Sequence, residues 1–127
     1  YVYIASRTKV NVTVTRRINR VNVPQEGVEV RVYDFSFGLC ADMVDGVAGN
    51  GLKAQNYKYA YFDCPSYYWG ITDANGNTQI GVLPGKYLVI VGLDTNNNGV
   101  IDLFDTFKGY IINNIQCGAT QNISFYF

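Results

Sequence analysis

The stretch that decides the fold is ITDANGNTQIGVLPGKYLVIVGLDTNNNGVIDLFD, residues 71–105. It contains two turn signals, TDANGNT around Gly76 and LPGKY around Pro84, built from residue types that accommodate tight chain reversals. After the second turn comes the apolar run YLVIVGL, residues 87–93. A run that short, rich in Val and Ile and bounded by turns, is typical of a strand buried on both faces. The stretch therefore predicts two hairpin turns leading into a central strand.

A calcium-loop pattern follows the apolar run directly. Residues 94–105, DTNNNGVIDLFD, fall in register with the EF-hand loop, which takes oxygen ligands from alternating positions and has a glycine at its sharp turn, here Gly99. With three formal negative charges, the loop should bind calcium weakly, with a Kd of ~10⁻⁴–10⁻³ M. The alternative is an Asn/Asp-rich surface turn that binds no metal. The expected Ca²⁺ ligands are Asp94, Asn96, Asn98, the Val100 carbonyl, Asp102 and Asp105.

Composition favours an exported β-protein. The chain has 127 residues, enough for one domain with a full core, and its 11 Tyr and 7 Phe accompany many Val, Ile and Thr residues. The formal net charge is zero and charged residues make up 16%, which argues against nucleic acid or an anionic membrane as a partner. No apolar run reaches the ~18 residues of a membrane span. Because the first residue is Tyr rather than Met, we expect either a processed mature protein or a fragment, and both fit a chain located outside the cell.

The N-terminal segment YVYIASRTKVNVTVTRR, residues 1–17, alternates between two faces throughout. At ~3.3 Å per residue it would span about 56 Å, whereas a domain of this size is about 30–35 Å across. Residues 8–127 therefore suffice for the domain, and residues 1–7 form an extension. Either the extension bends back onto its own sheet, or it is a donor strand for another subunit. The donated residues would be Tyr1, Val2, Tyr3, Ile4, Ala5 and Ser6.

Two further segments read as half-buried strands. EGVEVRVYD, residues 26–34, has its valines on one face, and we expect the opposite face, with Glu29, Arg31 and Tyr33, to be exposed to solvent. ATQNISFYF, residues 119–127, alternates in the same way and places Ile, Phe and Phe on one face. Both segments predict strands with one side on a core.

In their order along the chain, EGVEVRVYD, TDANGNTQIGVLPGKYLVIV and GATQNISF resemble the transthyretin-like, carboxypeptidase-regulatory-type β-sandwich family. The resemblance covers residues 8–34 and 70–127. It implies an all-β Greek-key sandwich of about seven strands, used as a structural or accessory module of secreted proteins and not as an enzyme. The calcium loop resembles the dockerin type, which also ends in Asp, but no amphipathic helices flank it.

An irregular insertion rich in Gly and Tyr, residues 36–66, interrupts the resemblance. Alternating tyrosines at residues 57–61 predict a short edge strand within it. Cys40 and Cys64 bracket the insertion, and a disulfide between them would close a loop of about 25 residues and contribute on the order of 3 kcal/mol. Cys117 is the alternative partner for either one. The aromatic residues either cover the core or form a platform that binds sugars. Those with a candidate ligand-binding role are Tyr59, Tyr61, Tyr68 and Trp69.

The sequence offers little for catalysis. The chain contains no His, so the usual general base is missing and we expect no enzyme activity. Asn11 and Asn122 each begin an N-x-S/T sequon in a predicted strand, and both are candidate glycan sites. Secreted sandwiches similar to the CnaB type join such strands by a Lys–Asn isopeptide bond, for which Lys9 and Asn122 are the candidate pair.

Two functions fit these observations. The first is a structural subunit of an extracellular filament, pilus-like fibre or surface layer, joined head-to-tail to copies of itself by β-strand addition and stabilised by calcium. The alternative is a carbohydrate- or protein-binding accessory module of a larger secreted protein, with the Tyr-rich insertion as its ligand face.

Overall fold

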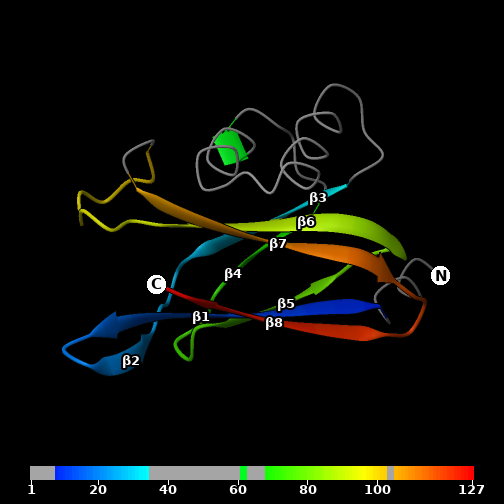
Figure 1. Ribbon diagram of the computed structural model, residues 1–127, viewed down its shortest axis with the longest axis horizontal. Helices are drawn as coiled ribbons and strands as arrows, with labels where there is room; N and C mark the ends of the chain where they lie inside the picture. Colours follow the sequence, from blue (N-terminus) through cyan, green and yellow to red (C-terminus); the bar gives the residue numbers. More distant parts are fainter. Residues whose placement is uncertain (1–7, 35–60, 63–67, 103–104) are drawn as a thin grey trace.

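The computed structural model describes residues 8–34, 61–62, 68–102 and 105–127. The predicted extension at residues 1–7, most of the insertion, Tyr59 and the predicted Cys40–Cys64 pair lie outside these ranges. The described residues form eight strands (Figure 1). These strands are β1 (Lys9–Ile18), β2 (Val21–Pro24), β3 (Glu29–Asp34), β4 (Tyr68–Ile71), β5 (Asn77–Gly81), β6 (Gly85–Leu93), β7 (Thr106–Ile115) and β8 (Thr120–Tyr126).

Two four-stranded sheets pack face to face (Figure 1). In the first sheet β1 is central, with β8 parallel to it on one side and β5 and β2 antiparallel along successive halves of its other side. The second sheet has the order β4-β3-β6-β7 and is antiparallel throughout. The all-β Greek-key β-sandwich predicted from the sequence is confirmed, with β2 as a strand that the sequence did not indicate.

The main core lies between the two sheets. The valines at alternate positions of β1 are buried, as the N-terminal pattern predicted, and they pack with the inward residues of β3, β6 and β8. In the same way, Ile123 and Phe125 of β8 are buried. The members of this core include Val10, Val12, Val14, Val30, Val32, Tyr87, Val89, Val91, Ile112, Ile123 and Phe125.

Strand β6 is buried on both faces, as its apolar run predicted. Val89 and Val91 face the main core, while Leu88 and Ile90 belong to a second cluster with Tyr33, Tyr61 and Phe107. The second cluster occupies the outer face of the β3–β6–β7 sheet. The prediction that Tyr33 faces solvent is therefore wrong, because only 2% of its surface is exposed.

The turn signals join sheets instead of closing hairpins. The turn after β4 is capped by Asp73, whose Oδ1 accepts hydrogen bonds from the backbone N–H groups of Asn75 and Asn77 at 2.9 and 3.0 Å. It leads from β4, which pairs with β3, to β5, which pairs with β1. The segment between β5 and β6 crosses back to the other sheet. The two predicted hairpins are therefore wrong: the turn residues specify a reversal, but the face that each strand buries selects its partner.

Some element boundaries also differ from expectation. Asn19 and Arg20 have φ of 51° and 69°, which closes a tight β1–β2 hairpin where the sequence indicated only a connection. The sequence TFKGYII, residues 106–112, predicts a strand, and β7 continues beyond it to Ile115. Tyr61 and Phe62 are helical, so the strand predicted through residue 61 does not form at that end (Figure 1).

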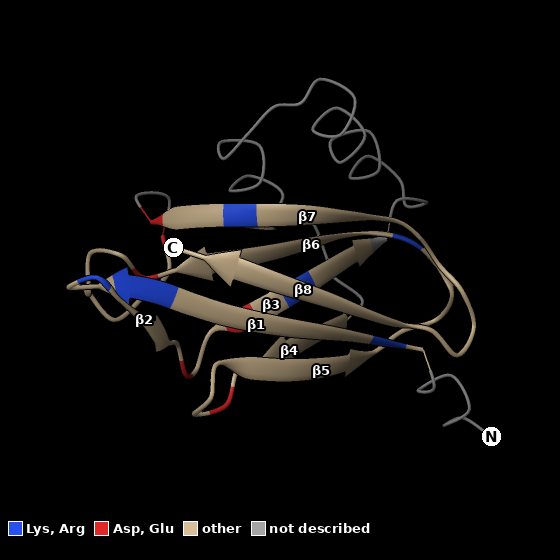
Figure 2. Cartoon of the chain, turned by 60° about the horizontal axis from the view of Figure 1, so that its bottom comes forward, with Lys and Arg blue, Asp and Glu red and all other residues tan. Residues whose placement is uncertain are grey.

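Charged side chains avoid the middle of the sandwich. Figure 2 shows that the acidic residues gather at turns and strand ends, while several basic residues lie on β1, β3 and β7. Within the described residues, no helix is both long and apolar enough to span a membrane.

Candidate functional site

The loop between β6 and β7 is organised by its own side chains. Asp94, directly after β6, accepts hydrogen bonds from the backbone N–H groups of Asn98 at 3.3 Å and Gly99 at 2.8 Å. Asn97 and Gly99 have φ of 57° and 87°, in the left-handed region that Gly and Asn tolerate best. The sharp turn at Gly99 is thus where the calcium-loop pattern placed it.

At the other end of the loop, Asp105 is 3% exposed. Its Oδ1 accepts from the Thr95 N–H at 3.2 Å, and its Oδ2 accepts from the Asp102 N–H at 2.8 Å. One carboxylate therefore ties the two arms of the loop together. Burial without such partners would cost several kcal/mol, so these two bonds explain how a carboxylate is tolerated there.

The oxygen atoms in this loop are of the chemical types that bind a hard cation such as Ca²⁺. Carboxylate, amide and carbonyl oxygens are the ligands that Ca²⁺ prefers. Among the described residues, however, no three His, Cys, Asp or Glu side chains come together as a metal-binding group. Asn98 Nδ2 donates to Asp102 Oδ2 at 2.9 Å, so a bound cation would have to replace this bond. Calcium binding by Asp94, Asn96, Asn98, Val100, Asp102 and Asp105 stays a prediction.

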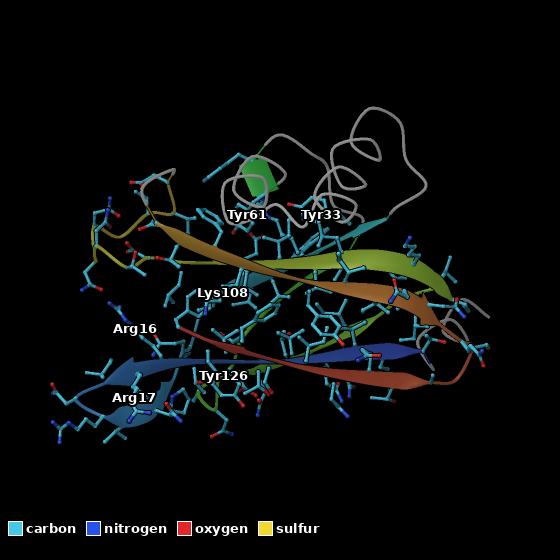
Figure 3. The ribbon with its side chains drawn as sticks, viewed as in Figure 1. Arg16, Arg17, Tyr33, Tyr61, Lys108 and Tyr126 are labelled. Carbon is cyan, nitrogen blue, oxygen red and sulfur yellow. The ribbon has the colours of Figure 1, made fainter. Side chains whose placement is uncertain are left out.

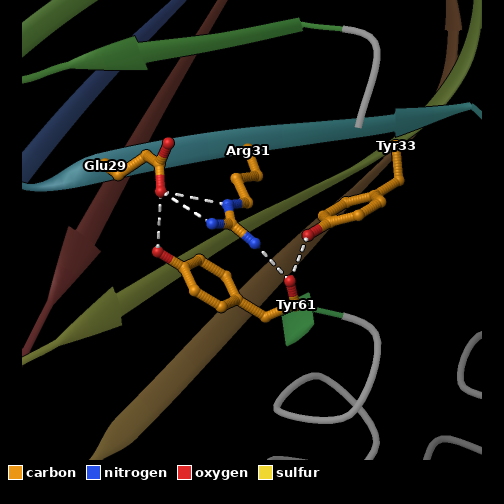
Figure 4. Close-up of polar contacts among 4 residues, drawn as sticks. All are labelled: Glu29, Arg31, Tyr33 and Tyr61. Atoms are coloured by element: carbon orange, nitrogen blue, oxygen red, sulfur yellow. Dashed lines mark hydrogen bonds and ion pairs between the residues drawn. The ribbon is translucent and has the colours of Figure 1, made fainter. Parts of the chain in front are cut away.

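Tyr61 is locked to β3 by a polar network (Figure 4). Its Oη donates to Glu29 Oε1 at 3.2 Å, and its carbonyl accepts hydrogen bonds from Tyr33 Oη, at 3.0 Å, and from Arg31. Arg31 also forms an ion pair with Glu29, with Nη2 and Oε1 2.9 Å apart, and its guanidinium carbon lies 3.9 Å from the centroid of the Tyr61 ring. Ring contacts with Phe62 and Phe107 complete the packing.

Burial raises the pKa of both Tyr33 and Tyr61 to about 12, because the phenolate form would lose its hydration. Arg31 favours the ionised form of each, but its effect on the pKa is smaller than that of burial. Both hydroxyls are therefore protonated at neutral pH and act as hydrogen-bond donors. Tyr61 is a packing residue with 2% of its surface exposed.

Sequence reasoning missed this network, although one signal for it was present. A strand with apolar side chains on both faces, such as β6, requires a cover on each face. The outward side chains of β3, the strand next to β6, are covered by the same residues that cover the outer face of β6. Burial of Tyr33 could therefore have been inferred from the apolar run at residues 87–93.

The other aromatic candidates are separated from this network. Tyr68 is partly buried and packs edge-on against Tyr87, with ring centroids 5.9 Å apart. Trp69 is 60% exposed on β4. Of the four aromatic residues singled out in the sequence, Trp69 is the one that the structure leaves open to a ligand in the described ranges.

The two sequon asparagines lie directly opposite each other. Asn11 of β1 pairs with Asn122 of β8, and Asn11 Nδ2 donates to Asn122 Oδ1 at 3.1 Å. Asn11 Oδ1 accepts in turn from Gln79 Nε2 at 2.9 Å. In this register Lys9 faces Thr120, two residues before Asn122 on β8, and the Lys9–Asn122 isopeptide bond stays a prediction. Whether either asparagine carries a glycan stays a prediction.

Cys117 lies in the turn between β7 and β8 and is a free, exposed thiol. Its predicted alternative role as a disulfide partner involves Cys40 or Cys64, both outside the described residues. The Cys40–Cys64 disulfide stays a prediction.

Comparison with known proteins identifies the fold. No family profile matches the chain, and no curated protein matches it in sequence. In structure it is similar to GBS52, the minor pilin of Streptococcus agalactiae, with a TM-score of 0.50 and 14% identity over 94% of this chain and 43% of that chain. It is also similar to BcpA*(D312A), the major pilin subunit of Bacillus cereus, with a TM-score of 0.50 and 14% identity over 94% of this chain and 29% of that chain.

A third similar structure is a 9R-lipoxygenase from Cyanothece PCC8801, with a TM-score of 0.48 and 18% identity over 98% of this chain and 17% of that chain. That TM-score is too low to support an argument. This chain spans less than half the length of each of these three proteins. At 14% identity, the likeness to the pilins shows the fold alone.

Proposed function

We propose that this chain is a structural subunit of an extracellular filament or pilus-like fibre, assembled from copies of itself by β-strand addition and stabilised by calcium. The likeness in fold to two pilins supports a structural role rather than an enzymatic one. The observation that carries the proposal is the way in which the domain begins. Thr8 is 1% exposed, its carbonyl accepts from the Val82 N–H, and its Oγ1 accepts from the Gly118 N–H, both at 2.9 Å.

The described strands form two four-stranded sheets without residues 1–7, which supports the assignment of the strand-like residues upstream of Thr8 as an extension. YVYIAS carries no charged side chain and alternates Val2 and Ile4 with Tyr1 and Tyr3. A segment of this kind, left free in water, is prone to aggregate. Pairing with the sheet edge of a neighbouring subunit satisfies its backbone and covers its apolar side chains. Such a head-to-tail contact does not close on itself, so it produces filaments.

The proposed calcium site is the loop of residues 94–105. The left-handed turn at Gly99 and the oxygen donors around it support the assignment. A cation there would offset the repulsion among Asp94, Asp102 and Asp105 and hold the β6–β7 connection. Since a ligand that binds only the folded state stabilises it by mass action, the expected gain at calcium concentrations near or a few-fold above the Kd is about 0.5–1 kcal/mol.

One observation favours the alternative, an accessory module that binds a glycan or another protein. Trp69 is 60% exposed, and an exposed indole face is a common stacking surface for sugars. In this case a glycan array should give a signal that Trp69→Ala removes. If no glycan or protein binds, or if Trp69→Ala has no effect, the alternative is excluded for this residue.

The experiment for the main proposal removes residues 1–6 and follows the product by light scattering. We expect the full chain to form polymers and the shortened chain to stay monomeric with an unchanged urea midpoint, because Thr8 and the strands after it are retained. Polymers that persist without residues 1–6 would contradict strand addition by this segment.

A further inference from the structure

Strand β4 is an edge strand without charged side chains. It is the outer strand of its sheet and pairs only with β3 among the described residues. Its four residues, Tyr68–Ile71, include no charged side chain, and Trp69 and Ile71 are each 60% exposed. Natural edge strands are usually guarded by charges, Pro or bulges because their free backbone groups accept other strands. β4 has none of these in its described residues.

The direction of the free backbone groups follows from the hydrogen bonds at the end of β4. The Thr72 N–H donates to the Val28 carbonyl at 3.0 Å, so the backbone of Thr72 points toward β3. Backbone groups alternate in direction along a strand. Gly70 therefore also points toward β3, while the N–H and C=O groups of Trp69 and Ile71 point outward.

The opposite side of the sandwich is different. Lys108 of β7 reaches across to β8, where its Nζ donates to the Tyr126 carbonyl (Figure 3). The same Nζ lies 5.4 Å from the centroid of the Phe127 ring. A lysine over an edge opposes the addition of another strand, because an incoming strand would have to displace or bury its charge. Of these two sides, the β4 side is the one open to an uncharged strand.

We infer that β4 is the acceptor edge for residues 1–6 of a second copy of this chain, with backbone hydrogen bonds to Trp69 and Ile71. This inference rests on the proposed function and adds the place where the donated strand binds. The donor has no charge and alternates in side-chain direction, which suits an edge without charges. A hollow of about 260 Å³ between β4 and β5, lined by Tyr68, Trp69, Gln79, Ile80 and Gly81, provides room for an inward side chain of the donor.

Residues 1–6 of the same chain are poorly placed to pair along β4, so a second copy is the proposed donor. Thr8 is fixed beside Val82 by a backbone hydrogen bond. From there, the far side of β4 is about two strand spacings away laterally and one sheet spacing in depth, together roughly 14 Å. Crossing that distance uses about four residues at ~3.3 Å each. About three of residues 1–7 would then remain for pairing, fewer than the four residues of β4.

The test uses Trp69, the only Trp of the chain, as a reporter at the proposed edge. A synthetic peptide of residues 1–7 is titrated into the chain that lacks residues 1–6, and tryptophan emission is recorded. We expect a saturable blue shift, because the added strand removes the exposed indole from water. A peptide with the same residues in scrambled order is the control. Emission that does not respond to the peptide would overturn the inference.

Two substitutions at one position separate backbone pairing from side-chain packing. Ile71→Pro removes an outward N–H and leaves the bonds to β3 in place, as expected for Pro on an edge strand. Ile71→Thr keeps that N–H and loses a comparable apolar contact. We expect Ile71→Pro to weaken peptide binding about tenfold more than Ile71→Thr, the effect of one lost hydrogen bond. Equal binding by the two variants would count against β4 as the acceptor.

The two levels of the proposal fail in different ways. Suppose that the full chain assembles and the shortened chain does not, but the peptide leaves Trp69 emission unchanged and Ile71→Pro leaves assembly unchanged. Strand addition by residues 1–6 then stands, and the acceptor edge is not β4. If the shortened chain assembles like the full chain, the donor assignment itself fails. If the full chain is a monomer with blue-shifted emission at every concentration, its own segment covers Trp69 and the inference is wrong.

Discussion

Arg31 binds Tyr61 at two points: its guanidinium carbon lies 3.9 Å from the centroid of the Tyr61 ring, and its Nη1 donates to the Tyr61 carbonyl. The two residues are 30 positions apart: Arg31 lies on β3, and Tyr61 packs against the outer face of the same sheet. Together with Tyr33 and Glu29, they cover the outer face of the β3–β6–β7 sheet. This cover shields Leu88 and Ile90 from solvent and forms the second core cluster.

Replacing Tyr61 tests how much this cluster contributes to the free energy of unfolding. Tyr61→Ala should reduce the free energy of unfolding by about 3 kcal/mol, because it empties a buried ring site. Tyr61→Phe should cost only about 1 kcal/mol, since it removes the bond to Glu29 and keeps the ring. Urea denaturation measures both. Tyr126→Ala is the control, because that ring is 60% exposed. A loss for Tyr61→Ala no greater than that of the control would show that the cluster is not structural.

The raised pKa values of Tyr33 and Tyr61 predict a loss of stability in strong base. Each group has a folded pKa of about 12 against an ordinary value of 10.0. A raised folded pKa means that the stability is fully present below pH 10 and is lost as the pH rises toward 12. The free energy of unfolding should therefore fall between these limits, and it should fall less steeply in Tyr33→Phe. A profile that is flat through this window, or identical in the variant, would contradict the burial of these hydroxyls.

Calcium binding predicts a melting temperature that depends on calcium. A chelator should lower the melting temperature of the wild-type chain, and Asp94→Ala should abolish the response by removing the first ligand. Asp73→Ala is a matched control, because Asp73 also caps a turn with its carboxylate but lies outside the calcium loop. It should lower stability and keep the calcium response. If the melting temperature of the wild-type chain is the same with and without calcium, residues 94–105 form a turn that does not bind calcium.

Gly76 and Gly118 form a matched pair for the turns. Both have positive φ, 77° and 82°, so an added side chain strains either one by about 1 kcal/mol. At Gly76 a Cβ would also lie 2.6 Å from the Val14 carbonyl oxygen, whereas at Gly118 nothing lies within 4 Å. Gly76→Ala should therefore lose about 2 kcal/mol more than Gly118→Ala in denaturant titrations. Similar losses would mean that the turn after β4 does not dock on β1 as described.

The sequence was informative where the signal is local. The apolar run at residues 87–93 predicted a strand buried on both faces, and β6 is such a strand. Alternation predicted the buried valines of β1 and the inward residues of β8. These predictions succeed because side-chain alternation and turn chemistry depend on a few neighbouring residues.

The predictions that failed required pairing over long distances. TDANGNT indicated a reversal, but nothing within it specifies that β4 pairs with β3 while β5 pairs with β1. The contact between Asn11 and Asn122, which the sequence did not indicate, also depends on long-range pairing: β1 and β8 are parallel neighbours, and the two residues are 111 positions apart. No local pattern encodes such a contact. The loop of residues 94–105 is an intermediate case: its turn at Gly99 formed as the local pattern predicted, whereas calcium binding stays a prediction.

The most direct measurement of the proposed function is negative-stain electron microscopy of the full chain at increasing protein concentration in the presence of calcium. The account predicts unbranched filaments that become more numerous with concentration, and only isolated particles from the chain that lacks residues 1–6. Isolated particles from the full chain at every concentration, or the same filaments from both chains, would contradict it.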